Sequence, residues 1–155
     1  MRKPAEERFW SKVEKTEGCW NWTKGTHPSG YGMFSFQGRN RYAHRYSYAL
    51  ANGPIPEGLS IDHICHNPGC VRPDHLRAVT HKQNHENRAG ADTNSRSGVR
   101  GVNLHVKSGK WQVRVSQGGK IHSGGLFVDL EDARAAAVAL RNSIFTYNDA
   151  DKNAA

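Results

Sequence analysis

The spacing of three cysteines and one histidine constrains this chain more than any other feature. Cys65, Cys70 and His75 follow one another with four residues between each pair, and Cys19 is the remaining cysteine. Thiolates combined with an imidazole at such short spacing are the ligands that tetrahedral zinc takes in proteins. We therefore expect these four side chains to form one closed zinc site that stabilises the fold, with His66 as the alternative fourth ligand.

The size and charge of the chain agree with a small, metal-stabilised protein that binds a polyanion. Its 155 residues are enough for one domain or two very small ones, and with 36% hydrophobic residues any single core is modest. The net charge of +8 favours nucleic acid as the partner. Three cysteines cannot all pair within one chain, and no apolar run reaches membrane-spanning length. We therefore expect a reducing, cytoplasmic setting with no membrane partner.

Composition and turn signals divide the chain into two modules. Residues 89–98 are small and polar, so they are typical of a linker between a first module at 1–88 and a second module at 99–148. In the first module we expect a hairpin, then a helix that Gly53-Pro54 stops, then a second helix opened by a capping-box spacing. The expected ranges are 30–36 and 41–43 for the strands, 44–52 for the first helix and 81–88 for the second.

The second module has a clearer pattern of strands followed by one helix. Three strand candidates alternate with glycine-containing turns, and an acidic segment then opens an alanine-rich helix. The strands are expected at 99–106, 111–116 and 120–127, and the helix from Asp129 onward. The apolar face of that helix must cover one side of the antiparallel sheet, which leaves the opposite side open to a partner.

Asp62, His63 and Asn84 are the candidate catalytic residues of the first module. Asp62 and His63 lead directly into the cysteine-rich segment, and Asn84 falls in the first turn of the helix expected at 81–88. Cleavage of a phosphodiester needs a base that deprotonates water and a positive charge at the scissile phosphate. A neutral imidazole suits the first task near pH 7, and the side-chain oxygens of Asp62 and Asn84 suit a hard divalent cation such as Mg²⁺.

The segment 17–88 resembles the HNH nucleases of the ββα-metal class. Asp62-His63, the cysteine-rich segment and Asn84 carry this resemblance, and their spacing is similar to that of the His-Cys box homing endonucleases in particular. One departure is Arg72, which stands where such proteins often carry asparagine. Phage-type HNH proteins are also similar in three short motifs, which here are Gly-Tyr-Gly at 30–32, Ala-His-Arg at 43–45 and Asn-Gly-Pro-Ile-Pro-Glu-Gly at 52–58.

The HNH resemblance implies a Mg²⁺- or Mn²⁺-dependent endonuclease, of phage or homing type, that acts on double-stranded DNA inside a cell such as a phage-infected bacterium. His63 would activate water as the general base. Asn84 would hold the single catalytic metal ion, and Asp62 would be a second ligand or would orient the site. One such centre cuts one strand, so duplex cleavage requires a homodimer or two encounters. The arginines that could neutralise the phosphate are Arg41 and Arg45, with Arg39 as a further candidate.

Residues 96–145 resemble the AP2 domain, in which three strands pack on one helix and the sheet docks into the major groove of DNA. The order of a Gly-Val, a Lys-Trp and a Gly-x-Phe motif before the alanine-rich helix carries this resemblance. It implies that polar side chains of the module contact phosphates or base edges, whereas Trp111 fits the core as well as it fits DNA. The candidate DNA-binding residues are Arg100, Asn103, His105, Lys110, Trp111, Arg114 and His122.

Together these patterns predict an α+β chain in which a zinc-stapled ββα-metal nuclease module precedes a three-stranded antiparallel sheet packed on one helix. The leading functional hypothesis is a DNA endonuclease. The alternative is a zinc-stabilised DNA-binding or regulatory protein that does not cut. The joint presence of Asp62, His63 and Asn84 favours the endonuclease, because a protein that only binds DNA needs none of them at this spacing.

Overall fold

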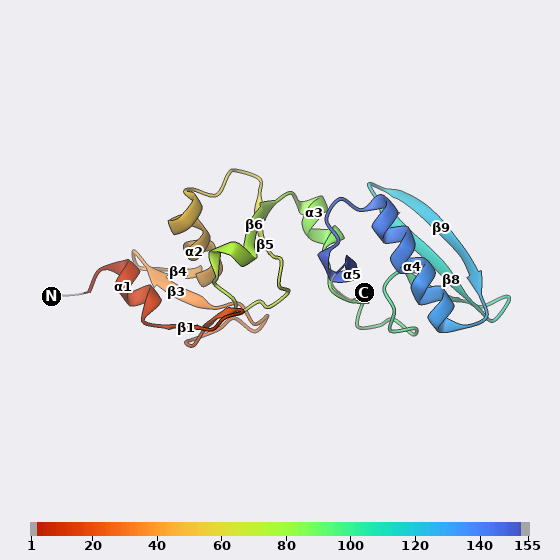
Figure 1. Ribbon diagram of the computed structural model, residues 1–155, viewed down its shortest axis with the longest axis horizontal. Coiled ribbons are helices and arrows are strands. Elements are labelled where there is room, and N and C mark those ends of the chain that lie inside the picture. Colours follow the sequence, from red (N-terminus) through yellow and green to blue (C-terminus); the bar gives the residue numbers. More distant parts are fainter. Residues whose placement is uncertain (1–2, 153–155) are drawn as a thin grey trace. The chain divides into compact units, whose positions relative to one another are not determined.

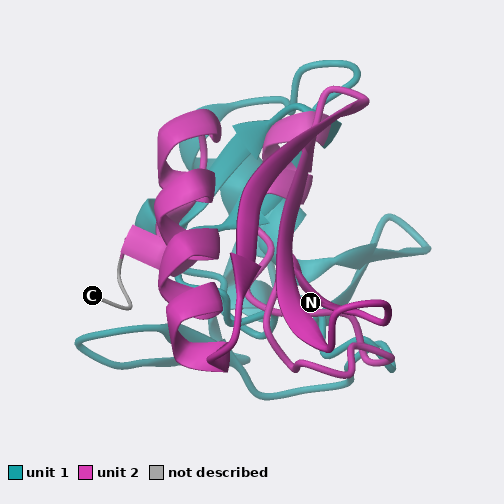
Figure 2. Cartoon of the chain, turned by 90° about the vertical axis from the view of Figure 1, so that its right-hand side faces the viewer, with its two compact units in different colours: residues 1–81 teal, residues 82–155 magenta. Residues whose placement is uncertain are grey.

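The computed structural model describes residues 3–152, which form two compact units. The first unit ends at His81 and the second begins at Lys82 (Figure 2). This boundary differs from the sequence-based one, because residues 82–88 make their contacts with the second unit rather than with the first. Each unit has its own cluster of buried apolar side chains.

The first unit contains short elements joined by turns and loops (Figure 1). Its strands form three two-stranded antiparallel sheets, β1 with β2, β3 with β4, and β5 with β6. The elements are α1 (Ala5–Trp10), β1 (Val13–Lys15), β2 (Trp20–Trp22), β3 (Met33–Phe36), β4 (Arg39–Tyr42), α2 (Ala43–Asn52), β5 (Ser60–His63), η1 (Pro73–His75) and β6 (Leu76–Val79).

The hairpin of β3 and β4 and the helix α2 appear where the sequence predicted them. Gln37 and Gly38 have φ angles of 51° and 72°, as the two central residues of a tight hairpin turn require. The turn is therefore two residues long rather than four, and β4 begins at Arg39. Helix α2 ends before Gly53, whose φ of 83° lies in the left-handed region that favours glycine.

Aromatic side chains from distant parts of the sequence make the core of the first unit. Phe9 of α1 is fully buried, and its ring lies within 5.2 Å, centroid to centroid, of the rings of Trp22 and Phe34. Ala43 and Val71 complete the buried cluster. No sequence pattern predicted α1, β1 or β2, although they supply part of this core. Each of these elements has six residues or fewer, which is too short for a repeating pattern of apolar residues to be recognised in the sequence.

The second unit consists of the sheet β7-β8-β9, one long helix and two short helices. All three strands are antiparallel to their neighbours, and α4 lies along one face of the sheet (Figure 1). The predicted α+β class and the three-stranded sheet packed on one helix are confirmed. The elements are α3 (His81–Glu86), β7 (Val102–His105), β8 (Lys110–Gln117), β9 (Lys120–Phe127), α4 (Leu130–Ile144) and α5 (Asp149–Lys152).

Small side chains let α4 approach the sheet closely. Ala133 and Ala137 of α4 are fully buried against Val102 and Val113. Gly124 lies at the β-bulge between β8 and β9, where a Cβ atom would come within 2.5 Å of the Val113 side chain. Asp129 caps α4, because its side chain accepts hydrogen bonds from the first backbone N–H groups of the helix. The helix therefore begins where its acidic segment predicted.

The helices of residues 3–152 are too short or too polar to span a bilayer.

Candidate metal centre and active site

Cys19, Cys65, Cys70 and His75 come together in the first unit as a compact metal-binding cluster. Their ligand atoms all lie within 4.8 Å of one another. The Nδ1 atom of His75 is 3.7 Å from Cys19 Sγ and 3.6 Å from Cys70 Sγ. Tetrahedral zinc, with Zn–S near 2.3 Å and Zn–N near 2.1 Å, separates a sulfur and a nitrogen ligand by about 3.6 Å. The four residues therefore fit a metal ion such as zinc in both donor type and spacing.

Backbone pairing between β2 and the cysteine-rich loop brings Cys19 to the other ligands. The Trp22 N–H donates to Gly69 O at 2.9 Å, and the Val71 N–H donates to Trp20 O at 2.8 Å. Cys70 is thereby held opposite Asn21 in an isolated β-bridge. The 3₁₀ turn η1 then delivers His75 at its last position. The cluster combines segments more than forty residues apart in sequence, so a bound ion would staple the first unit.

Arg72 holds the loop that carries Cys19. Its guanidinium donates to the carbonyl oxygens of Glu17 and Gly18, both at 2.7 Å, and its backbone N–H points at Cys70 Sγ at 3.4 Å. The sequence analysis noted Arg72 as a departure from the family pattern without assigning it a role. The structure shows that this arginine ties the two halves of the metal cluster together.

The thiols of Cys65 and Cys70 have pKa values shifted in opposite directions. A hydrogen bond from Cys65 lowers the pKa of Cys70 and correspondingly raises the pKa of Cys65. A thiolate at Cys70 is the form that binds metal. His66, the alternative fourth ligand, is outside the cluster, and its backbone has a φ of 54°. The structure therefore assigns the fourth position to Cys19.

His63 ends β5 directly beside the metal cluster. It is 6% exposed, and its Nε2 atom lies 3.0 Å from the carbonyl oxygen of Cys70. Because a carbonyl can only accept, Nε2 carries the hydrogen, and the lone pair of the neutral ring is at Nδ1. Burial lowers the pKa of His63, so the ring is neutral near pH 7. This is the tautomer and charge state of a general base.

Two further rings, not predicted as site residues, surround His63. The His44 ring lies 4.7 Å from the His63 ring and the Tyr31 ring lies 5.8 Å from it, centroid to centroid. His44 is buried, and that burial, with the charges of His63 and Arg45 as smaller causes, lowers its pKa to about 3. The Ala-His-Arg and Gly-Tyr-Gly motifs that carried the family resemblance therefore supply two rings that pack near His63.

Asp62 is tied to an arginine on the neighbouring strand. Arg77 lies opposite Asp62 in the register of β5 and β6, and its Nε and terminal nitrogen donate to Asp62 Oδ2 at 3.0 and 2.9 Å. Consecutive strand residues point to opposite faces, so Asp62 and His63 face away from each other. Sequence reasoning missed Arg77, because nothing in the local pattern indicated that residues 76–79 pair with β5.

The remaining predicted residues of the nuclease module occupy three separate elements. Asn84 is half-buried on α3, which is grouped with the second unit. Arg41 of β4 and Arg45 of α2 are both exposed and line one groove of about 640 Å³ in the first unit. Arg39 stands at the exposed start of β4. The structure thus brings Arg41 and Arg45 together as candidates for a phosphate contact.

The open face of the second unit carries four of the predicted DNA-binding residues. Val113 and Val115 of β8 are buried under α4, so the alternating residues Lys110 and Arg114 point to the opposite face. His105 lies opposite Lys110 in the β7–β8 register, and Asn103 belongs to the same row. Cross-strand partners share a face, so these side chains form one polar surface on the side of the sheet away from α4.

The other three predicted DNA-binding residues lie elsewhere. Trp111 packs against the core cluster, and His122 pairs with the buried Val115, so both belong to the helix-covered side. Arg100 precedes the sheet, and its guanidinium donates to backbone carbonyls of residues 85, 86 and 88. The sequence left open whether Trp111 packs in the core or contacts DNA, and the structure places it against the core.

Comparison with known proteins agrees with the geometry of the first unit. Residues 41–86 match the family model of the HNH endonucleases. This HNH segment includes the three later metal ligands, both of the groove arginines, His63 and Asn84. Cys19 lies before the matched segment, so its place in the cluster comes from the structure.

Relatives of the chain occur in a bacteriophage. Protein 7.7 of Escherichia phage T7 is 40% identical over 70 residues, which are 45% of this chain and 54% of that protein. Protein 2.8 of the same phage is 36% identical over 81 residues, covering 50% of this chain and 55% of the relative. Protein 3.8 of that phage is 36% identical over 80 residues, which are 52% of this chain and 65% of the relative. The chain therefore spans between about half and two thirds of the relatives it matches, and no solved structure matches it.

Proposed function

We propose that this chain is a metal-dependent, phage-type endonuclease that hydrolyses phosphodiester bonds of double-stranded DNA inside the host cell. The observation that carries the proposal is the 3.0 Å contact between His63 Nε2 and Cys70 O. This contact supports the proposal because it leaves the lone pair of the neutral ring at Nδ1, in a residue adjacent to the metal-binding cluster and within the HNH segment. The runner-up, a DNA-binding protein that does not cut, gives no reason for a buried, oriented histidine at this position.

The proposed reaction begins with proton transfer to His63. The Nδ1 lone pair takes a proton from a water molecule, and the resulting hydroxide attacks the phosphorus of the scissile phosphate. The phosphorus–O3′ bond breaks, which gives a 5′-phosphate and, after protonation of the leaving oxygen, a 3′-hydroxyl. The Cys70 carbonyl keeps the ring oriented and accepts a hydrogen bond from the imidazolium that forms. Arg41 or Arg45 would neutralise charge on the phosphate.

Asp62 and Asn84 carry side-chain oxygens of the kind that a hard divalent cation such as Mg²⁺ or Mn²⁺ takes. Asn84 offers a side-chain carbonyl oxygen, and we propose it as a ligand. Asp62 offers a carboxylate, but Arg77 already binds one of its oxygens, so Asp62 fits the role of an orienting group at least as well as that of a ligand. When bound, the cation would stabilise the developing charge on the phosphate and the leaving oxygen. The Cys₃His cluster has no hard oxygen donor, so its metal is structural.

A plasmid assay tests the proposed activity. Supercoiled DNA is incubated with zinc-loaded protein and Mg²⁺ or Mn²⁺, with EDTA as the control. We expect nicked or linear product only when the divalent ion is present, and the ratio of the two forms reports whether one strand or both are cut. Intact plasmid under every metal and salt condition, together with retained DNA binding, would support the non-cutting alternative instead.

We further propose that the polar open face of β7 and β8 binds the DNA backbone. Its charged members, Lys110 and Arg114, are both exposed. The AP2 resemblance remains a prediction, but the arrangement of strands and helix is the one that it implies. Lys110→Gln and Arg114→Gln should each reduce the slope of log affinity against log salt by about 1. Arg134→Gln, on the exposed side of α4, removes the same charge and should leave the slope unchanged.

A further inference from the structure

The carboxyl end of helix α3 is built into the second unit by a buried polar network. Glu86 is 3% exposed, and its carboxylate accepts hydrogen bonds from the backbone N–H groups of Thr146 at 3.0 Å and Tyr147 at 3.4 Å. Gln117 of β8 donates to the same carboxylate at 3.3 Å. Burying a charged carboxylate without hydrogen-bond partners is costly, so these bonds offset the cost of burying Glu86. These contacts therefore hold the last turn of α3 firmly.

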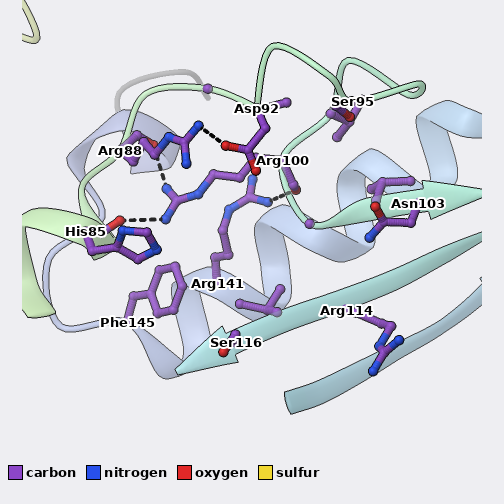
Figure 3. A pocket seen from close by; sticks show the side chains of 16 residues that line it. His85, Arg88, Asp92, Ser95, Arg100, Asn103, Arg114, Ser116, Arg141 and Phe145 are labelled. Atoms are coloured by element: carbon purple, nitrogen blue, oxygen red, sulfur yellow. Dashed lines mark hydrogen bonds and ion pairs between the residues drawn. The ribbon is translucent and has the colours of Figure 1, made fainter. Parts of the chain in front are cut away.

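Arg100 binds the other polar groups at this helix end. Its guanidinium donates to the carbonyl oxygens of His85 at 3.0 Å and of Arg88 (Figure 3), and also to that of Glu86 at 3.1 Å. The last carbonyls of a helix have no partner within the helix, so a cation that binds them caps the helix and complements its dipole. The guanidinium also stacks over the Phe145 ring at 5.3 Å, which fixes its position.

Next along the chain, Asn87 adds a further anchor. It is 2% exposed, and its side-chain oxygen accepts a hydrogen bond from the backbone N–H of Asp149 at 3.0 Å. The partners of the α3 end thus come from the segment before β7, from β8, and from the turn between α4 and α5. A six-residue helix cannot be stable by itself, so the position of every residue on α3 depends on these partners.

We propose that Arg100 and Glu86 are positioning residues for Asn84, so that the second unit, beyond binding DNA, holds the metal-binding asparagine in place. Asn84 stands on α3 two residues before Glu86, within the turn that the network fixes. This inference rests on the proposed role of Asn84 as a ligand of the catalytic cation. It also gives Arg100 a function other than the DNA contact expected from the sequence.

The test measures Mn²⁺ binding directly, by the electron paramagnetic resonance signal of free Mn²⁺, on the zinc-loaded full-length chain. Asn84→Ala and Arg100→Gln should both raise the dissociation constant for Mn²⁺, about 10-fold or more, as loss of groups that orient a ligand usually does. Arg134→Gln, which removes an arginine paired with Glu131 on α4, should bind Mn²⁺ as the wild type does. Plasmid cleavage by Asn84→Ala and by Arg100→Gln should require correspondingly higher Mn²⁺ concentrations than cleavage by the wild type.

A pair of substitutions at Glu86 separates positioning from general stability. Glu86→Gln keeps an oxygen that accepts from Thr146, whereas Glu86→Ala does not, so glutamine should restore much of the Mn²⁺ affinity that alanine loses. If Arg100→Gln fails to fold by circular dichroism, Arg100→Lys keeps the charge but not the fork of donors, and should give an intermediate affinity. Wild-type Mn²⁺ affinity in folded Arg100→Gln, or in Asn84→Ala, would overturn the inference. Normal Mn²⁺ binding with no cleavage by the wild type would overturn only the proposed activity.

Discussion

His44 and His63 are neighbouring buried histidines, and burial lowers the pKa of each. Of the two rings, and within residues 3–152, only that of His63 has a backbone hydrogen-bond acceptor, the Cys70 carbonyl, which defines the nitrogen that carries the proton. The buried Nδ1 of His44 has no hydrogen-bond partner among residues 3–152. At the scale of single residues, the same buried environment therefore leaves the His63 ring oriented by a hydrogen bond and the His44 ring neutral beside it.

The low pKa of His44 predicts a specific loss of stability in acid. The folded protein holds this ring neutral down to a pKa of about 3, whereas the unfolded chain takes up the proton at the usual value of 6.5. Stability is therefore complete above pH 6.5 and falls as the pH drops between 6.5 and 3. By pH 5 the His44 contribution alone should cost about 2 kcal/mol.

Guanidinium unfolding followed by tryptophan fluorescence measures this effect, because Trp10, Trp20 and Trp22 report on the first unit. The variant His44→Gln cannot take up the proton, so its stability should change less between pH 7 and pH 5 than that of the wild type. An equal pH dependence in both proteins would show that His44 is not the titrating group.

At this scale the sequence predicted the metal ligands because their chemistry is local. Cys65, Cys70 and His75 lie within eleven residues, and few side-chain types bind zinc. The partner of Asp62 was not predictable in the same way. Arg77 reaches it only because β6 pairs with β5 in one particular register, and a cysteine-rich loop rather than a tight hairpin turn joins the two strands.

The metal cluster is the element that joins β2, the cysteine-rich loop and η1 in the first unit. Metal analysis should find about one zinc ion per chain, and Cys70→Ser should lose it together with much of the stability of this unit. His66→Ala is the matched control, since His66 is adjacent in sequence but outside the cluster, and should retain zinc. A folded wild-type protein that contains no metal would contradict the assignment.

Trp22 of β2 packs closely against Gly32, which lies just before β3. A Cβ atom at Gly32 would lie 2.6 Å from two atoms of the Trp22 ring, which is itself buried in the aromatic core. Gly32→Ala should therefore destabilise the first unit by about 1–3 kcal/mol through overpacking.

Gly25 provides the comparison, because a Cβ atom there would meet nothing within 4 Å. Gly25→Ala should leave the midpoint of guanidinium unfolding close to that of the wild type. Equal midpoints for Gly32→Ala and Gly25→Ala would mean that the Trp22 contact does not limit packing.

The two units of the molecule meet between residues 81 and 82, whereas the sequence indicated a boundary at residues 89–98. Composition marked residues 89–98 as the linker, yet α3 makes its buried contacts with the second unit. The decisive contacts join residues as far apart as Glu86 and Thr146, and no local pattern shows them. The α+β class, the sheet with its helix and the clustering of three cysteines with His75 were predictable, whereas the partners of α3, Asp62 and Arg72 were not.

If His63 is the base of a DNA-cleaving site, its removal must lower the single-turnover rate of plasmid cleavage. His63→Ala should slow cleavage by about 10²–10⁴-fold in saturating Mg²⁺, while zinc content and DNA affinity stay at wild-type values. His27→Ala, which removes an exposed histidine of the same unit, should cleave at the wild-type rate. A folded, zinc-loaded His63→Ala protein that cleaves as fast as His27→Ala would contradict the account.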